Sequence, residues 1–214
     1  MSAEPALGLT RANLPERSLV CLERGGRLSP DVWLVASDAG RVVVKDFAAR
    51  GGWVRATLGP WFVRHECHVY QRLRSHPAVP RLLGRIDALA FAVEHRGGVR
   101  ISRRQPWTFS PEFGRHLEAA VRELHALGVV HLDLRHRSNV RAGLDGAPVL
   151  IDFASAVSFR PGGLAARLLL PLLGLADRWA VWKWRRRLSD QPLCTEDASG
   201  AASEGPRGAS RPTK

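Results

Sequence analysis

The first half of the chain alternates short apolar runs with turn residues, which is the pattern of an antiparallel sheet. The runs are rich in β-branched residues, and glycine, proline or aspartate separates them. A predicted loop (51–60) and a longer segment with helical spacing interrupt them after the third run. We therefore expect a small antiparallel sheet with one helix, with strands at 17–23, 31–37, 41–47, 82–87 and 88–93.

The segment 61–74 predicts this helix and places one carboxylate on its apolar side. Apolar residues lie three and four positions before and after Glu66, namely Phe62, Val63, Val69 and Tyr70. A carboxylate turned toward a core needs an ionic or hydrogen-bonding partner, or its pKa rises until it is neutral. We expect the sheet to supply that partner.

Lys45 is the partner that the composition favours. Lysine occurs at only three positions, so nearly all of the 32 basic residues are arginine. Lys45 lies in R-V-V-V-K-D-F, a run that reads as a buried strand. A compact ammonium suits a tight site in which a guanidinium fork would not fit. We predict a buried pair of Lys45 with Glu66; the alternative is an edge-strand lysine whose ammonium reaches water.

A metal site is a second interpretation of the same helix, because His65 and His68 flank Glu66 in the sequence H-E-C-H. Ligands three positions apart on a helix can share a metal ion. No further cluster of ligands accompanies them, and Arg64 and Arg72 add positive charge nearby. We therefore favour the ion pair.

After a basic loop (99–109), the second half of the chain begins with a well-delimited helix. Ser110, Pro111 and Glu112 supply an N-cap, a proline at the first helical position and an acid in the first turn. A single apolar stripe follows, and Gly128 is placed to end the helix. The next stretch, 129–157, is predicted to form a turn, a hairpin and an apolar strand.

Two carboxylates in that stretch follow directly after apolar residues. Asp133 lies in the turn with His131 and Asn139, and Asp152 ends the apolar strand. One carboxylate could orient a hydroxyl and accept its proton, while a carboxylate and an amide oxygen could hold Mg²⁺ against ATP phosphates. This chemistry gives a reason for acidic groups so close to a core.

The overall charge indicates which classes of binding partner the protein favours. The formal net charge is +12, which favours nucleic acid, anionic lipid or phosphorylated substrates as partners. The alternative is that solvated arginines are spread over every face of the protein.

The three cysteines are far apart, with no C-x-x-C pair, so we expect a reducing compartment. The first residues contain no apolar segment that would predict a signal peptide. Dispersed basic residues without a helix-turn-helix or zinc spacing disfavour a specific nucleic-acid binder.

Taken in order, these motifs resemble the protein-kinase-like fold over roughly residues 18–160. The short chain, its arginine-rich composition and the L-D-L-R turn are most similar to small bacterial lipopolysaccharide (Kdo/WaaP) kinases and RIO-like kinases. The segments that carry the resemblance are V-V-V-K, the helix with Glu66, F-A-V-E-H, H-L-D-L-R-H-R-S-N-V and I-D-F-A.

The resemblance implies a role for each motif residue. Lys45, held by Glu66, would bind the α- and β-phosphates of ATP, and Asp133 would accept a proton from the acceptor hydroxyl. His131 would brace the turn. The remaining implied roles are Mg²⁺ coordination by Asn139 and Asp152, backbone groups for adenine from Glu94 and His95, and backbone amides near the phosphates from Gly25 and Gly26.

The chain also departs from the kinase pattern. One extra residue separates Asp133 from Asn139, so Ser138 occupies the expected metal-ligand position. Ala154 replaces the glycine of D-F-G, and Leu132 replaces the arginine of H-R-D. No A-P-E segment follows. These departures argue against a conventional, regulated protein kinase.

The segment 162–188 combines leucines, three tryptophans and a run of arginines. Its longest uninterrupted apolar run, 168–176, is shorter than the roughly 20 residues that span a bilayer. One interpretation is an interfacial segment that rests on anionic lipid. The other is a closing helix whose tryptophans lie in the core, and the two could apply to different faces.

Together these features predict a two-lobed α+β protein. We expect a flexible arm (1–16), an N-lobe (17–95), a minimal C-lobe (96–188) and a disordered tail (189–214). The expected function is ATP- and Mg²⁺-dependent phosphorylation of a sugar hydroxyl on a lipopolysaccharide-type glycolipid, at the inner face of the cytoplasmic membrane. The alternatives are a RIO-like Ser/Thr protein kinase and a membrane-associated pseudokinase scaffold.

Overall fold

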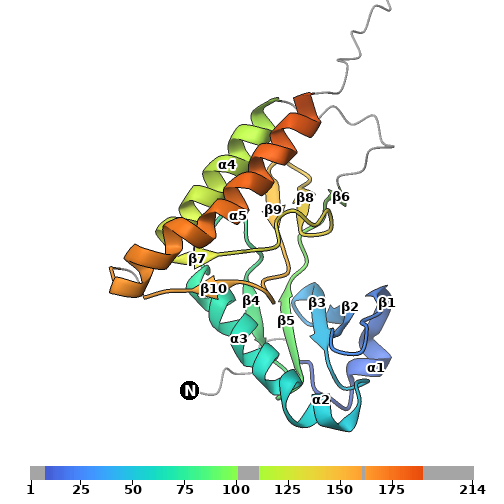
Figure 1. The fold of residues 1–214 in the computed structure, drawn as a ribbon. Helices are drawn as coiled ribbons and strands as arrows, with labels where there is room; N and C mark the ends of the chain where they lie inside the picture. Colours follow the sequence, from blue (N-terminus) through green and yellow to red (C-terminus); the bar gives the residue numbers. More distant parts are fainter. Residues whose placement is uncertain (1–7, 101–110, 161, 190–214) are drawn as a thin grey trace, which may run out of the picture.

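A computed structural model describes residues 8–100, 111–160 and 162–189, and these form a mixed α+β fold. The main sheet is antiparallel with the strand order β1-β2-β3-β5-β4 (Figure 1). All five strands overlap the predicted ones. Their bounds are β1 Ser18–Glu23, β2 Asp31–Ser37, β3 Gly40–Asp46, β4 Leu82–Arg85 and β5 Ala90–Glu94.

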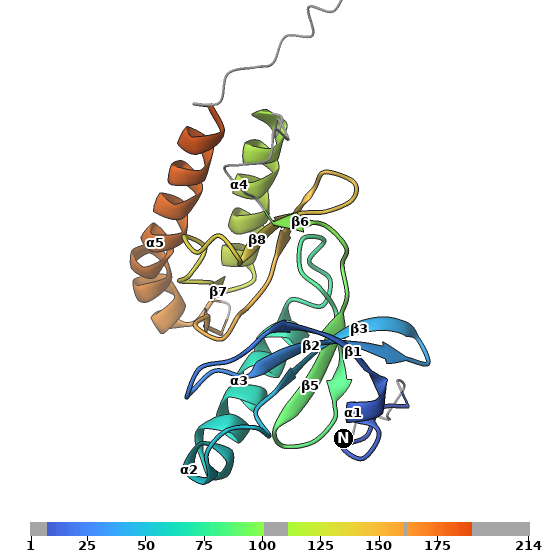
Figure 2. The same ribbon diagram turned by 90° about the vertical axis from the view of Figure 1, so that its right-hand side faces the viewer.

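Five helices accompany the sheet in the described residues. α3 lies across one face of the sheet, and α4 and α5 lie side by side at the other end of the molecule (Figures 1 and 2). The helices are α1 Leu14–Arg17, α2 Gly52–Ala56, α3 Leu58–Arg72, α4 Pro111–Ala126 and α5 Leu164–Ser189.

Two small sheets connect these parts. The first has the order β6-β8-β9 and contains the predicted hairpin of the 129–157 stretch; the second pairs β7 with β10. The bounds are β6 Val99–Arg100, β7 Val129–Val130, β8 Val140–Ala142, β9 Pro148–Leu150 and β10 Val157–Ser158. The β8–β9 hairpin and the β7–β10 pair therefore hold both ends of the loops that carry Asp133 and Asp152.

Alternation along β3 determines which side chains face α3. Val42 and Val44 are buried on the side of the sheet that α1 covers, whereas Val43, Lys45 and the following Phe47 face the opposite side. Because successive side chains of a strand point to opposite faces, the pattern that buries the valines also directs Lys45 toward α3.

One hydrophobic core runs through both predicted lobes. It includes Phe91 of the sheet, Tyr70 of α3, Leu124 of α4 and Trp184 of α5. The predicted boundary at residue 95 therefore lies at a change in secondary structure, while the packing continues across it. Gly128, which we expected to end α4, has a positive φ of 75°, and glycine adopts this conformation without the strain of a Cβ.

The N-terminal segment differs from the predicted flexible arm. Residues 8–16 pack against the sheet, with Leu9 and Leu14 buried. Arg11 forms ion pairs with Asp46 and Asp87, each at 2.6 Å. The short segment carries too few apolar residues to predict packing by composition, and its partners are distant in sequence. Residues 1–7 lie outside the described residues.

The segment 51–60, predicted as a loop, is largely helical. Gly51 is the N-cap of α2, and Pro60 lies in the first turn of α3. A proline is tolerated in a first turn because its missing N–H has no intrahelical partner there. Gly51 and Pro60 therefore lie where helices begin, and the predicted loop is wrong.

The C-terminal predictions are only partly covered by the described residues. The segment 162–188 forms α5, and Pro171 lies inside this helix. Beyond Ser189 the predicted tail lies outside the described residues, as does most of the predicted basic loop 99–109. In the part of the chain that the structure describes, no helix has the length and apolarity needed to cross a membrane.

Candidate active site

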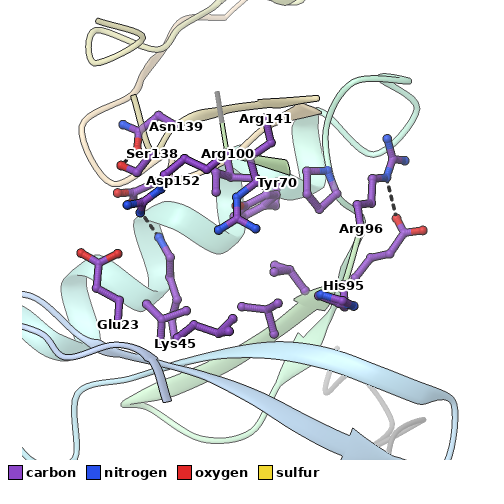
Figure 3. Close-up of a pocket in the computed structure, with 17 residues that line it drawn as sticks. Glu23, Lys45, Tyr70, His95, Arg96, Arg100, Ser138, Asn139, Arg141 and Asp152 are labelled. Atoms are coloured by element: carbon purple, nitrogen blue, oxygen red, sulfur yellow. Dashed lines mark hydrogen bonds and ion pairs between the residues drawn. The ribbon is translucent and has the colours of Figure 1, made fainter. Parts of the chain in front are cut away.

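A cleft lies between the main sheet and the β6-β8-β9 sheet (Figure 3). Five of the predicted site residues line it: Lys45, Glu94, His95, Asn139 and Asp152. Its walls are apolar on the sheet side, from Leu22, Val32, Val43 and Val93, with Ile151 opposite. Polar groups lie at one end, from Lys45, Ser138, Asn139 and Asp152. Three arginines, Arg96, Arg100 and Arg141, also line the cleft, together with the acidic residues Glu23 and Glu94. Such a cleft could hold a ligand with a flat apolar part and a negatively charged part.

The predicted pair of Lys45 and Glu66 is present. The Lys45 ammonium donates to Glu66 Oε1 at 2.5 Å, and the two residues are 8% and 1% exposed. Burial alone would lower the pKa of Lys45, but the carboxylates of Glu66 and Asp152 outweigh it and raise that pKa. The lysine is therefore held as an ammonium at the end of the cleft.

Asp152 is the second carboxylate on this ammonium. Its Oδ1 accepts a hydrogen bond from Lys45 Nζ at 2.7 Å, and the charge of Lys45 lowers the pKa of Asp152. Its side chain is 46% exposed, so the carboxylate also faces the open cleft. The next residue, Phe153, donates its backbone N–H to Glu66 Oε1 at 3.2 Å. Glu66 therefore fixes both the lysine and the backbone beside Asp152.

The backbone at Asp152 adopts an unusual conformation. Its φ is 67°, and Leu132 has a φ of 66°; these are the two positive-φ residues other than glycine in the described part of the chain. A leucine in this region is strained, and such strain concentrates at functional sites. The left-handed turn occurs at Asp152 itself, two residues before Ala154, so the alanine is not required to adopt it.

Asn139 reaches the site in spite of the extra residue before it. Two successive turns close the intervening chain: His136 N–H donates to Asp133 O, and Asn139 N–H donates to His136 O. The Asn139 amide then donates to Asp133 Oδ2 at 3.0 Å, and Ser138 Oγ donates to Asn139 Oδ1 at 2.8 Å. Asp133 does not line the cleft but is joined to it through Asn139.

His131 connects the two loops that carry the carboxylates. It is buried, its Nε2 donates to Ile151 O at 3.1 Å, and its Nδ1 accepts the Asp133 N–H at 3.4 Å. Burial lowers the pKa of His131, which keeps the imidazole neutral, as these two bonds require. His131 braces the turn, as the resemblance implies.

Asp177 of α5 binds the backbone of the turn at His131, and the sequence analysis did not predict this contact. Its two oxygens accept the backbone N–H groups of His131 (2.8 Å) and Leu132 (2.9 Å), and its Oδ2 also lies 3.0 Å from His125 Nε2. Trp184 Nε1 donates to Leu134 O at 2.8 Å. The sequence could have identified Asp177, because it is the one acidic residue between Asp152 and Asp190.

Gly25 and Gly26 lie outside the residues that line the cleft. Arg50 donates to the carbonyls of both glycines, and Asp31 accepts the Gly25 N–H at 2.8 Å. A Cβ on Gly25 would lie 2.2 Å from Ser29 O, so close backbone packing explains this glycine. A role of the pair toward phosphate stays a prediction.

Glu94 and His95 line the cleft as predicted for an adenine-binding segment. The Glu94 N–H is already donated to Arg81 O at 2.9 Å, and the Glu94 carboxylate accepts from Arg81 N and Arg96 Nε. Of these two backbone donors, that of Glu94 is therefore engaged within the fold. His95 keeps its predicted role as a candidate.

The donor set favours a magnesium–phosphate ligand over a resident transition metal. No group of three or more His, Cys, Asp or Glu side chains that could hold a metal occurs among the described residues. His65 instead contacts Ala156 O and stacks on Trp61, and His68 is exposed. Asn139 and Asp152 line one cleft and carry oxygen atoms of the kind that Mg²⁺ binds, with Asn139 Oδ1 also accepting from Ser138 Oγ.

Replacing Asp177 tests its part in holding the turn. Asp177→Ala should lower the free energy of unfolding by about 3 kcal/mol or more, because it leaves buried N–H donors of His131 and Leu132 without an acceptor. Asp177→Asn keeps one oxygen acceptor and should cost less. Urea denaturation measures both.

The matched control is Asp38→Ala, because Asp38 is an exposed partner of Arg17 and exposed pairs contribute at most about 1 kcal/mol. Equal losses for Asp177→Ala and Asp38→Ala would contradict the structural role of Asp177.

Comparison with known proteins assigns the chain to no family. No protein-family model matches the sequence, and a search of curated proteins also finds no match. The arrangement of Lys45, Glu66, Asp133, Asn139 and Asp152 is therefore the basis on which a function can be argued.

Proposed function

We propose that this chain is an ATP- and Mg²⁺-dependent phosphotransferase with a two-lobed, protein-kinase-like fold. The observation that carries the proposal is the ammonium of Lys45, held between Glu66 and Asp152 at one end of a cleft whose sheet-side wall is largely apolar. A structural ion pair needs one carboxylate. The second, half-exposed carboxylate makes sense if it also holds a metal ion beside phosphate.

The cleft offers a place for each part of ATP. The apolar walls from Val32, Val43 and Val93 suit the adenine ring, and the Lys45 ammonium would bind phosphate oxygens at the far end. Asn139 and Asp152 would hold the Mg²⁺ ion, which supplies charge neutralisation on the phosphates. Positioning and electrostatic stabilisation account for most of the catalysis in phosphoryl transfer, and Lys45, Asn139 and Asp152 could supply both.

Asp133 would act on the acceptor. Its side chain is 36% exposed, and the Asn139 amide holds one of its oxygens. An oriented carboxylate in this position can accept a hydrogen bond from the attacking hydroxyl and take its proton. Arg135, 3.9 Å from the other oxygen, adds positive charge where an anionic acceptor would approach.

We favour a sugar hydroxyl on a lipopolysaccharide-type glycolipid as the acceptor. The support is the charge of the site. Arg100 and Arg141 line the cleft together with Arg96, which pairs with Glu94. Even with Glu23 also in the lining, basic residues outnumber acidic ones there, in a chain of net charge +12, and such glycolipids are anionic. A RIO-like protein kinase is the alternative enzyme. A membrane-associated pseudokinase scaffold that binds nucleotide without transfer is the alternative from another class.

Transfer of labelled γ-phosphate tests the reaction directly. Asp133→Asn should leave ATP binding intact and lower transfer to glycolipid or protein acceptors by about 10²–10⁴-fold, the usual contribution of a general base. The exposed Asp38→Asn is the matched control and should transfer at the wild-type rate. Wild-type turnover by Asp133→Asn would remove Asp133 from this role, and binding without transfer to any acceptor would favour the pseudokinase.

Two variants separate the stabilising role of Lys45 from its binding role. Lys45→Met leaves the buried Glu66 carboxylate without its cation and should cost about 3–5 kcal/mol of stability. Adding Glu66→Gln removes that charge and should restore much of the loss, yet ATP affinity should stay at least about tenfold below wild type. Calorimetric ATP titration and urea denaturation measure the two effects. Wild-type ATP affinity in the folded double variant would contradict the phosphate role of Lys45.

A further inference from the structure

α5 has two apolar faces, and one of them is exposed. Six large apolar residues on it are between 50% and 73% exposed. They are spaced by three or four positions, which places them on one stripe of the helix. We call this stripe the outer face of α5: Leu164, Leu168, Leu172, Leu175, Trp179 and Trp182.

The opposite face of α5 is fully used by the fold. Ala180, Val181 and Trp184 are buried in the core, and Asp177 is bonded to the turn at His131. α4 packs along this inner side, and in Figure 2 α5 forms the margin of the molecule with α4 beside it. The closing-helix interpretation of 162–188 therefore holds for Trp184, which lies in the core, whereas Trp179 and Trp182 are exposed.

Positive charge lies along the C-terminal half of the outer face. The Lys183 ammonium lies 4.8 Å from the ring centre of Trp179, and the Arg186 guanidinium lies 5.6 Å from that of Trp182. Arg178 is exposed on the same helix. Asp177, the single acidic residue within α5, is buried on the other side. An apolar stripe with tryptophans and basic residues at its margins matches the interface of an anionic bilayer.

The positive charge beside the outer face also distinguishes between two possible partners, a second copy of the chain and an anionic bilayer. Two copies of the chain that met through this stripe would bring like charges together at its margins, which is unfavourable. Anionic lipid headgroups would instead pair with Lys183 and Arg186 while the leucines enter the acyl boundary. We propose that the outer face of α5 rests on the surface of an anionic lipid bilayer, with the helix parallel to it.

Such docking would fix the height of the active-site turn above the lipid. Asp177 and Trp184 bind the backbone of His131, Leu132 and Leu134 from the inner face of α5. The turn is therefore separated from the outer face by the helix itself, which is about 10–12 Å across with its side chains. The docking rests on α5 alone; its use in presenting a membrane-bound acceptor to Asp133 rests on the proposed function.

Vesicle co-sedimentation of the full chain, without nucleotide, tests the docking. Wild type should bind vesicles of phosphatidylcholine with about one-third phosphatidylglycerol, and bind pure phosphatidylcholine vesicles at least about tenfold more weakly. Trp179→Ala/Trp182→Ala should lower binding to the anionic vesicles at least about tenfold. Trp53→Ala/Trp61→Ala, which removes two exposed tryptophans of α2 and α3, is the matched control and should bind as wild type.

Each opposing outcome overturns the proposal. Equal vesicle binding by the two double variants would remove the outer face as the docking surface, and equal binding to neutral and anionic vesicles would remove the role of charge. A lipid-free dimer that Trp179→Ala/Trp182→Ala dissociates would assign the face to a second copy. Urea denaturation confirms that the variants fold. Phosphate transfer to a soluble acceptor without vesicle binding would overturn the docking while leaving the proposed function intact.

Discussion

The buried ammonium of Lys45 is the constraint on which the rest of the site depends. A charge that is this buried is stable only with partners, because desolvation of a lone ammonium is costly. The partners come from distant parts of the chain: Glu66 from α3 and Asp152 from the segment after β9. The pairing therefore fixes α3 and the 151–153 segment against the sheet, and leaves the half-exposed Asp152 facing the cleft.

A second set of hydrogen bonds, made by His131 and Asp177, holds the loops that carry Asp133 and Asp152. His131 joins the backbone at Asp133 to that at Ile151, and Asp177 anchors the same turn to α5. The two loops that carry Asp133 and Asp152 are thus linked to each other and to the core. Preorganised groups of this kind need little rearrangement when charge develops in a reaction, which is consistent with a catalytic use of the cleft.

The sequence was sufficient for the features that local pattern determines. Alternation predicted the five strands, and helical spacing placed Glu66 on an apolar face, so its pairing with Lys45 could be inferred before the structure was known. The resemblance placed Asn139 near Asp133, although only the two successive turns of 133–139 show how the extra residue is accommodated.

The missed features depend on contacts between distant segments. Arg11 reaches Asp46 and Asp87, so residues 8–16 pack where composition suggested a free arm. Asp177 was overlooked because the leucines and tryptophans around it dominated the interpretation of α5. Glu66 was identified as a carboxylate on the apolar face of a helix, and the same reasoning would have identified Asp177. Gly25 proved to be needed for close backbone packing, which a glycine pair in a turn does not distinguish from phosphate binding.

Calorimetric titration of the unmodified protein with ATP, with and without Mg²⁺, tests the central claim most directly. If Lys45, Asn139 and Asp152 form a phosphate–magnesium site, one ATP should bind per chain, at least about tenfold more tightly when Mg²⁺ is present. Absence of ATP binding, or an affinity that Mg²⁺ does not change, would contradict it.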